Sequence, residues 1–260
     1  MSVIQEARSF RLLALDFDGV IVDSVLECAV VAYNGYHAFQ GSGSRIKLPQ
    51  EIPADTLSKF RSMRPYIRSG EDYLYLFQAL DEGITIADQV EFDKFHDTQL
   101  DRKEMYYRLF YAERAALMVS DHESWIALNP LYNGMVNFLQ LLKPELLLQI
   151  VSTKASRYIS EILDNNGIKL DSEQIHQAGR GSSKTDIISL LLQKNNLSPG
   201  EVAFVDDHPD TVYKVSKTGV MCFLAGWGYN DIEQQQLIID SDIPVIDLND
   251  LKEIGKYGNN

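Results

Sequence analysis

Four stretches of nearly continuous apolar residues predict buried strands. They are Phe10 to Asp16 (FRLLALD), Leu146 to Ser152 (LLLQIVS), Val202 to Asp206 (VAFVD) and Val220 to Leu224 (VMCFL). Such runs are typical of parallel strands that carry helices on both faces. A fifth strand is predicted over Ile243 to Leu248, at an edge of the sheet, because Pro244 has no backbone N–H to donate.

Helices are predicted between these strands, because apolar residues there recur three and four positions apart. The stripes run from Leu131 to Leu142 after the start signal Asn129-Pro130, from Tyr158 to Leu163 before Asn166-Gly167, and from Ile187 to Leu192 before Ser198-Pro199-Gly200. A short helix is predicted from Pro209 to Thr218, ended by Gly219. The alternation of strand and helix predicts an α/β fold with a doubly wound parallel sheet.

This alternation is interrupted between Ser24 and Leu128, where the pattern is helical and no buried strand is predicted. One stripe consists of Met105, Leu109, Ala112 and Ala116, residues 72–80 form a compact aromatic helix, and residues 41–53 read as a loop. We therefore predict an all-helical domain over residues 24–128, inserted into an α/β core made of residues 1–23 and 129–260. The two connections between the domains would form a hinge.

Composition and charge narrow the class of protein. With 45% apolar and 23% charged residues among 260, the chain reads as globular, and no apolar run approaches the roughly 20 residues that span a membrane. The first residues, MSVIQEARSF, lack the layout of a secretory signal, and two cysteines are too few to indicate a disulfide framework. A net charge of -13 disfavours nucleic acid as a partner. We expect a cytoplasmic protein that binds neither membranes nor nucleic acid.

Polar side chains stand where the predicted strands end, and ligands of open α/β sheets bind beyond the carboxyl ends of the strands. The candidates are Asp16, Asp18, Ser152, Asp206, Asp207 and Asp210, together with Lys184 at the start of a helix. Each of them taken alone also fits a turn, a helix cap or a solvated position. Several acids converging on one crevice would repel one another, and a divalent cation with oxygen ligands, such as Mg²⁺, would relieve that repulsion.

Four segments in this order resemble the motifs of the haloacid dehalogenase superfamily. They are DFDGVIVDS from Asp16, IVSTK from Ile150, Lys184 within RGSSKTDII, and FVDDHPD from Phe204. The helical insertion resembles the cap of the subgroup that contains phosphoglycolate phosphatase and β-phosphoglucomutase. Two positions depart from the commonest pattern, Val20 in the first motif and Thr153 in the second, and neither removes a group that the chemistry requires.

The resemblance implies a role for each candidate in a Mg²⁺-dependent phosphatase. Asp16 would attack phosphorus and form an aspartyl phosphate, while Asp18 would act as general acid and base. Asp16, Asp206 and the backbone carbonyl of Asp18 would hold Mg²⁺. The second acid at the metal is left open between Asp207 and Asp210, with Asp210 favoured as the supporting carboxylate. Ser152, the amide of Thr153 and Lys184 would bind the phosphoryl oxygens.

The predicted substrate is a small phosphorylated metabolite, and the protein would act as a monomer or homodimer. Arg61, Arg64 and Arg68 could bind an anionic substrate, but a solvated helix face is the favoured interpretation, and Pro65 disturbs any single helix through them. A phosphosugar mutase shares every core residue and stays open as an alternative. A non-catalytic receiver-like phospho-binding protein is disfavoured, because receivers place the acidic pair before the phosphorylated aspartate.

Overall fold

The computed structural model describes residues 10–43, 45–179 and 181–257. The chain forms two compact units, one made of Met1–Asp23 with Leu131–Asn260 and the other of Ser24–Pro130. Residues 1–9, on which the expectation about a secretory signal rests, lie outside the described ranges. Within those ranges, no helix has both the length and the apolar character needed to cross a membrane.

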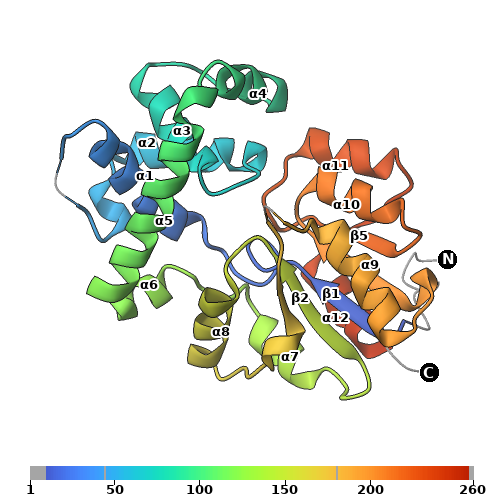
Figure 1. The fold of residues 1–260 in the computed structure, drawn as a ribbon. Helices are drawn as coiled ribbons and strands as arrows, with labels where there is room; N and C mark the ends of the chain where they lie inside the picture. Colours follow the sequence, from blue (N-terminus) through green and yellow to red (C-terminus); the bar gives the residue numbers. More distant parts are fainter. Residues whose placement is uncertain (1–9, 44, 180, 258–260) are drawn as a thin grey trace. The chain divides into compact units, whose positions relative to one another are not determined.

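The first unit is built on a six-stranded sheet in the order β3-β2-β1-β4-β5-β6, with every pair of neighbours parallel (Figure 1). The strands are β1 (Leu12–Leu15), β2 (Leu147–Ser152), β3 (Ile175–Gln177), β4 (Val202–Asp206), β5 (Met221–Ala225) and β6 (Val245–Ile246). This confirms the predicted α/β fold. Leu15 at the end of β1 pairs with Ile150 of β2 and Val205 of β4, so the carboxyl ends of these three strands meet at one edge.

The hydrophobic pattern does not predict β3. This strand has only three residues and reads Ile-His-Gln, so only one of its side chains is apolar. It lies at the edge of the sheet and pairs with β2 alone. Its His176 Nε2 lies 2.6 Å from Gln149 Oε1 of β2, so a polar contact contributes where the pattern looks for an apolar one.

Helices cover this sheet. They are α7 (Met135–Leu141), α8 (Ser156–Asn165), α9 (Lys184–Asn195), α10 (Pro209–Ser216), α11 (Ile232–Ile239) and α12 (Leu248–Tyr257), with short 3₁₀ turns at Ser172–Gln174 and Pro199–Glu201. Of these helices, α7 to α10 were predicted, with one correction, whereas α11 and α12 were not. The helix predicted from Leu131 begins only at Met135, because Leu131 forms an antiparallel bridge with Val22 and the left-handed Gly134 precedes the helix. Gly167 and Gly219 follow α8 and α10 with positive φ, as expected of glycine stops.

The core of this unit explains why the strand segments are so apolar. Leu12 of β1 and Phe204 of β4 are fully buried in one cluster with Ile188 of α9 and Val212 of α10. Strands in the middle of such a sheet have both faces covered, so neither face retains a polar stripe. Apart from Gln149 within β2, the polar side chains of the central strands stand where those strands end, and that is where the candidate site lies.

The second unit is helical. Its helices are α1 (Val25–Phe39), α2 (Ala54–Met63), α3 (Asp72–Asp81), α4 (Gln89–Asp97), α5 (Lys103–Ser120) and α6 (His122–Ala127), joined in part by 3₁₀ turns at Pro49–Glu51, Arg64–Tyr66 and Leu100–Arg102. Helix α1 packs against α3 and α5. The described part of this unit contains no strand. Within the expected loop over residues 41–53, the described residues 41–43 and 45–53 contain one 3₁₀ turn and neither a strand nor an α-helix.

The buried face of α5 differs from the predicted one. Met105, the first residue of the predicted stripe, is 45% exposed, whereas the buried residues are Tyr106, Phe110, Glu113, Arg114 and Leu117. The difference arises because Arg114 is buried as an ion pair: its guanidinium donates to both carboxylate oxygens of Glu27, at 2.8 and 2.7 Å. A pattern read from apolar residues alone cannot anticipate a charged pair on the packed face.

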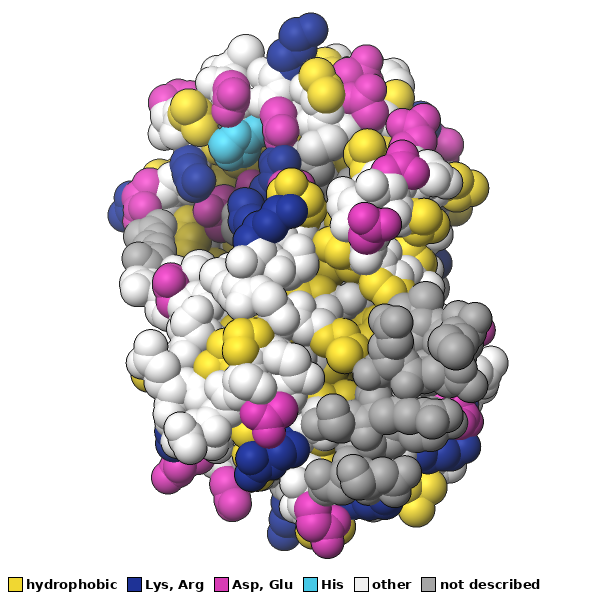
Figure 2. All heavy atoms as spheres, turned by 90° about the vertical axis from the view of Figure 1, so that its right-hand side faces the viewer, with side chains coloured by type: hydrophobic (Ala, Val, Ile, Leu, Met, Phe, Trp, Pro, Cys, Tyr) yellow, Lys and Arg dark blue, Asp and Glu magenta, His cyan; other side chains and the backbone are white. Residues whose placement is uncertain are grey.

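On the face drawn in Figure 2, acidic and basic side chains are interspersed. Both cysteines, Cys28 and Cys222, are buried thiols, in line with the expectation that no disulfide framework holds this chain.

Candidate active site

Asp16 is the first residue after β1, and the two neighbouring strands hold it in place. Its amide donates to the carbonyl of Val205 on β4 at 2.9 Å, and its Oδ1 accepts the amide of Phe17 at 2.7 Å. The hydroxyl of Ser152, at the end of β2, also hydrogen-bonds the carboxylate. Asp16 is only 6% exposed, so its carboxylate is both fixed and largely shielded from water.

Lys184 joins two of the strand ends. Its Nζ lies 2.7 Å from Asp16 Oδ2 and 2.7 Å from Asp206 Oδ2. Helix α9 begins at this lysine, and Ser183 caps the helix by accepting the amide of Asp186, which fixes where the lysine leaves the backbone. Burial alone would lower the pKa of Lys184, but the carboxylates of Asp16 and Asp206 outweigh it and hold that pKa above its usual value.

The negative charge around Asp16 is only partly compensated. Burial raises the pKa of Asp16 from 3.8 to about 6; Lys184 opposes this rise and Asp206 adds to it. One lysine therefore compensates two buried carboxylates only in part. A raised carboxyl pKa produced by burial and a like charge is characteristic of functional sites.

Three acids come together around this point. One carboxylate oxygen from each of Asp16, Asp206 and Asp207 lies within 4.8 Å of the other two, and all three residues are buried. Asp206 also accepts the amide of His208 at 2.8 Å. An all-oxygen set of buried carboxylates fits a hard divalent cation such as Mg²⁺.

Asp207 is positioned by a segment that the sequence analysis did not single out. The amide of Tyr229 donates to Asp207 Oδ2 at 2.8 Å, and a Cβ on Gly228 would lie 2.3 Å from the Cβ of Asp207. Gly19 has φ +82°, and a Cβ there would lie 2.0 Å from Asp207 Oδ2. Two glycines thus let Asp207 approach the loop after Asp16. The sequence offered one signal for this contact: the polar and glycine-containing segment GWGYN directly follows β5, and β5 is the neighbour of β4 in the sheet.

Asp18 has a partner that the sequence analysis also missed. Its Oδ1 accepts a hydrogen bond from Lys154 Nζ at 2.9 Å; the Asp18 side chain is 21% exposed and that of Lys154 is fully buried. Lys154 follows Ser152 by two residues, and its amide points to the Ser152 hydroxyl at 3.4 Å. Its position directly after the second strand end could have marked it as a site residue.

Two residues predicted to belong to the site, Asp210 and Thr153, have exposed side chains, unlike the buried residues described above. Asp210 is in the first turn of α10 and is exposed, so of the two acids left open by the sequence it is Asp207 that lies beside Asp16 and Asp206. The side chain of Thr153 is exposed in the turn after β2, which leaves its proposed role to its backbone amide.

The three arginines do not share one helix, because α2 ends at Met63 and a 3₁₀ turn containing Pro65 follows. Arg61 is exposed near the end of α2. The guanidinium of Arg64 lies over the Tyr73 ring, 5.2 Å from its centroid, and Arg68 forms a two-pronged ion pair with Asp93. Arg64 and Arg68 therefore make contacts within their own unit.

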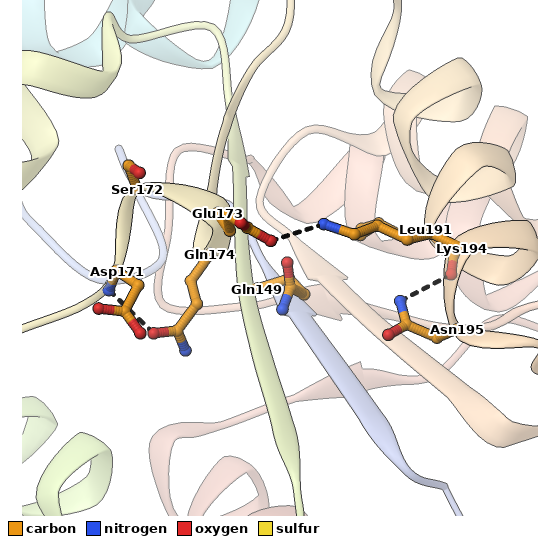
Figure 3. Close-up of a pocket in the computed structure, with 8 residues that line it drawn as sticks. All are labelled: Gln149, Asp171, Ser172, Glu173, Gln174, Leu191, Lys194 and Asn195. Atoms are coloured by element: carbon orange, nitrogen blue, oxygen red, sulfur yellow. Dashed lines mark hydrogen bonds and ion pairs between the residues drawn. The ribbon is translucent and has the colours of Figure 1, made fainter.

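A separate polar cavity of about 620 Å³ lies in the first unit (Figure 3). Its lining residues are Gln149, Asp171, Ser172, Glu173, Gln174, Leu191, Lys194 and Asn195. Lys194 and Glu173 form an ion pair of 2.9 Å across it. The lining contains none of the predicted site residues among those that the structure describes, so this cavity is distinct from the acidic cluster.

Comparisons with known proteins agree with one another. The sequence model of the haloacid dehalogenase-like hydrolases matches residues 10–212. The phosphoglycolate phosphatase of Vibrio cholerae is 25% identical over 227 residues, covering 86% of this chain and 87% of that protein. The phosphoglycolate phosphatase of Vibrio parahaemolyticus is also 25% identical, covering 86% of each chain. A haloacid dehalogenase-like family hydrolase from Streptococcus pneumoniae superposes with a TM-score of 0.63 at 16% identity, over 95% of this chain and 98% of that one.

Proposed function

The chain belongs to the haloacid dehalogenase-like hydrolases and is a phosphohydrolase of that family, and we propose that it hydrolyses a small phosphorylated metabolite through an aspartyl phosphate on Asp16. One observation carries the proposal. Three buried carboxylates, those of Asp16, Asp206 and Asp207, share one site with Lys184, which pairs with the first two at 2.7 Å. Such a group suits binding of a cation and of a phosphoryl group side by side.

Mg²⁺ fits the donor set, since every candidate ligand is an oxygen. Asp16, Asp206 and the backbone carbonyl of Asp18 would hold it, with Asp207 as the further acid beside them. When bound, the ion neutralises negative charge on the nucleophile and on the phosphoryl oxygens.

In the first half-reaction, a carboxylate oxygen of Asp16 attacks phosphorus while the bond from phosphorus to the ester oxygen breaks. Protonated Asp18 gives its proton to that oxygen, so the alcohol leaves neutral and the phosphoryl group stays on Asp16. In the second half-reaction, the Asp18 carboxylate takes a proton from water as the water attacks phosphorus. Inorganic phosphate is released, and Asp16 and Asp18 return to their starting forms.

The remaining residues hold the phosphoryl group during both steps. The Ser152 hydroxyl and the Thr153 amide would donate hydrogen bonds to its oxygens, and the Lys184 ammonium would stabilise the negative charge that they carry. In this arrangement the residues that follow β1 do the bond making and proton transfer. Those that follow β2 and open α9 bind and stabilise.

The names of the relatives suggest 2-phosphoglycolate as the first substrate to try. The proposal is tested by incubating the purified protein and Mg²⁺ with a panel of phosphorylated metabolites that includes 2-phosphoglycolate, and by measuring released phosphate. We expect release from at least one small phosphomonoester, stopped by excess chelator and by Asp16→Asn. Phosphate transfer between sugar positions without net release would instead identify a mutase, and full activity in chelator would contradict the Mg²⁺-dependent mechanism.

A further inference from the structure

Lys154 is a buried cation for which the proposed mechanism has no role. It follows the end of β2, and none of its side chain is exposed. Burying an ammonium group is costly unless a partner compensates its charge. The partner here is Asp18, whose Oδ1 lies 2.9 Å from Lys154 Nζ. The Phe17 ring also faces this ammonium, with its centroid 6.0 Å away.

The two buried lysines of the site serve different acids. Lys184 pairs with Asp16 and Asp206, the carboxylates assigned to nucleophilic attack and metal binding. Lys154 pairs with Asp18, the carboxylate assigned to proton transfer. The Asp18 side chain is 21% exposed, so packing holds it less firmly than it holds Asp16. A buried ion-pair partner can therefore do more to fix the orientation of the Asp18 carboxylate.

We propose that Lys154 is a positioning residue: it holds the Asp18 carboxylate in the orientation from which protons pass to the leaving group and from water. The anchor is held in place because the lysine side chain is fully buried and its backbone lies two residues beyond the end of β2. Proton transfer depends steeply on placement, since donor and acceptor must be within hydrogen-bond reach. This inference rests on the proposed function, and it adds that the acid–base residue is oriented by the strand next to its own.

The test compares Lys154→Met with the wild type on an aryl phosphate and on an alkyl phosphate from the substrate panel. An aryl oxide leaves without much help from a proton, so loss of a well-placed Asp18 affects it less. We expect kcat for the alkyl phosphate to fall about 10- to 100-fold, kcat for the aryl phosphate to fall less, and KM to change little for either. Lys194→Met, which removes a lysine of the separate cavity, is the matched control and should leave both rates unchanged.

A double-mutant cycle separates action through Asp18 from any independent effect. If Lys154 acts through Asp18, then Asp18→Asn with Lys154→Met should be no slower than Asp18→Asn alone. Thermal unfolding of each variant checks the fold, and Lys154→Gln takes the place of Lys154→Met in every comparison if the latter does not fold.

Three results would overturn the inference alone: unchanged rates in the variant, losses that multiply in the double mutant, or a KM that rises equally for both substrates. The last would make Lys154 a substrate-binding residue. If the wild type hydrolysed no ester of the panel, the proposed function would fail, and the inference would fail with it.

Discussion

Asp16, the proposed nucleophile, illustrates how a single buried site residue can weaken the fold that contains it. Burial raises the pKa of this carboxyl from 3.8 to about 6. Between these values the folded protein binds more protons than the unfolded chain, so this residue makes stability fall as pH rises through that window. Above about pH 6 the destabilisation is complete in the metal-free protein.

Asp16→Asn should therefore stabilise the metal-free protein while removing its activity. At about pH 8 in chelator we expect a gain of as much as about 3 kcal/mol in the free energy of unfolding, shrinking to about 1 kcal/mol at about pH 4.5. Lys184 keeps Asp206 as a partner in this variant. Urea unfolding at the two pH values measures the effect. A gain of equal size at both, or a loss at the higher pH, would show that the ionised form of Asp16 is not the cause.

The residues of the site differ in how far the sequence could predict them. Asp16, Asp206 and Lys184 were predictable, because each stands at a strand end or a helix start that the hydrophobic pattern defines. For Lys154 and Tyr229 the sequence offers only their positions shortly after β2 and β5, because their roles depend on contacts with Asp18 and Asp207, which follow other strands. Whether Asp207 or Asp210 joins the cluster depends on which way neighbouring side chains point at the start of α10, and spacing alone does not decide that.

At the scale of elements, the loops after β1 and β5 pack so closely that glycine is required. Gly19→Ala would combine an unfavourable positive φ with a Cβ 2.0 Å from Asp207 Oδ2. We expect the substitution to lower the free energy of unfolding by about 1–3 kcal/mol. We also expect it to raise the Mg²⁺ concentration needed for half-maximal turnover about 10- to 100-fold. Urea unfolding and a Mg²⁺ titration of activity measure the two effects separately.

Gly167→Ala is the matched control for this prediction. Gly167 also has a positive φ, +72°, but a Cβ there would meet nothing within 4 Å. This variant should lose stability by strain alone and keep its Mg²⁺ response. If Gly19→Ala behaved in the same way, close packing against Asp207 would not be what Gly19 provides.

Elements were predicted well where one face or both faces are uniformly apolar, and poorly where a polar contact replaces an apolar one. The central strands and the helix stops at Gly167 and Gly219 follow directly from the pattern. Strand β3, held at the edge with a His176–Gln149 contact, does not. The buried face of α5 was misassigned for the same reason, since Arg114 and Glu27 form an ion pair there.

For the whole molecule, the division into two units suggests a division of labour. The chain leaves the first unit after Asp23 and returns at Leu131, and Leu131 pairs with Val22, so the two connections start side by side. Val22 also forms a bridge with Asp18, so both connections start near that residue. We propose that the helical unit is a cap that selects the substrate, while the first unit carries out the chemistry.

Replacing residues 24–130 by a short Gly/Ser linker tests this division, because the ends to be joined are already adjacent. Provided that circular dichroism shows a folded α/β unit, we expect slow hydrolysis of a small aryl phosphate to remain and discrimination among metabolites to be lost. An unchanged ranking of substrates would place specificity in the first unit. Single Arg61→Ala, Arg64→Ala and Arg68→Ala variants refine the test, since a substrate contact should raise KM severalfold for an anionic metabolite only.

The proposed mechanism depends most on the covalent step at Asp16, and the Asp18→Asn variant gives the most direct view of that step. With an aryl phosphate, whose leaving group needs little protonation, this variant should still transfer the phosphoryl group to Asp16 but hydrolyse it slowly. Acid quenching followed by peptide mass spectrometry should then find one phosphoryl group on the peptide that contains Asp16, present with Mg²⁺ and absent in chelator. Steady turnover with no phosphoryl group on the protein, or one on another residue, would contradict the mechanism.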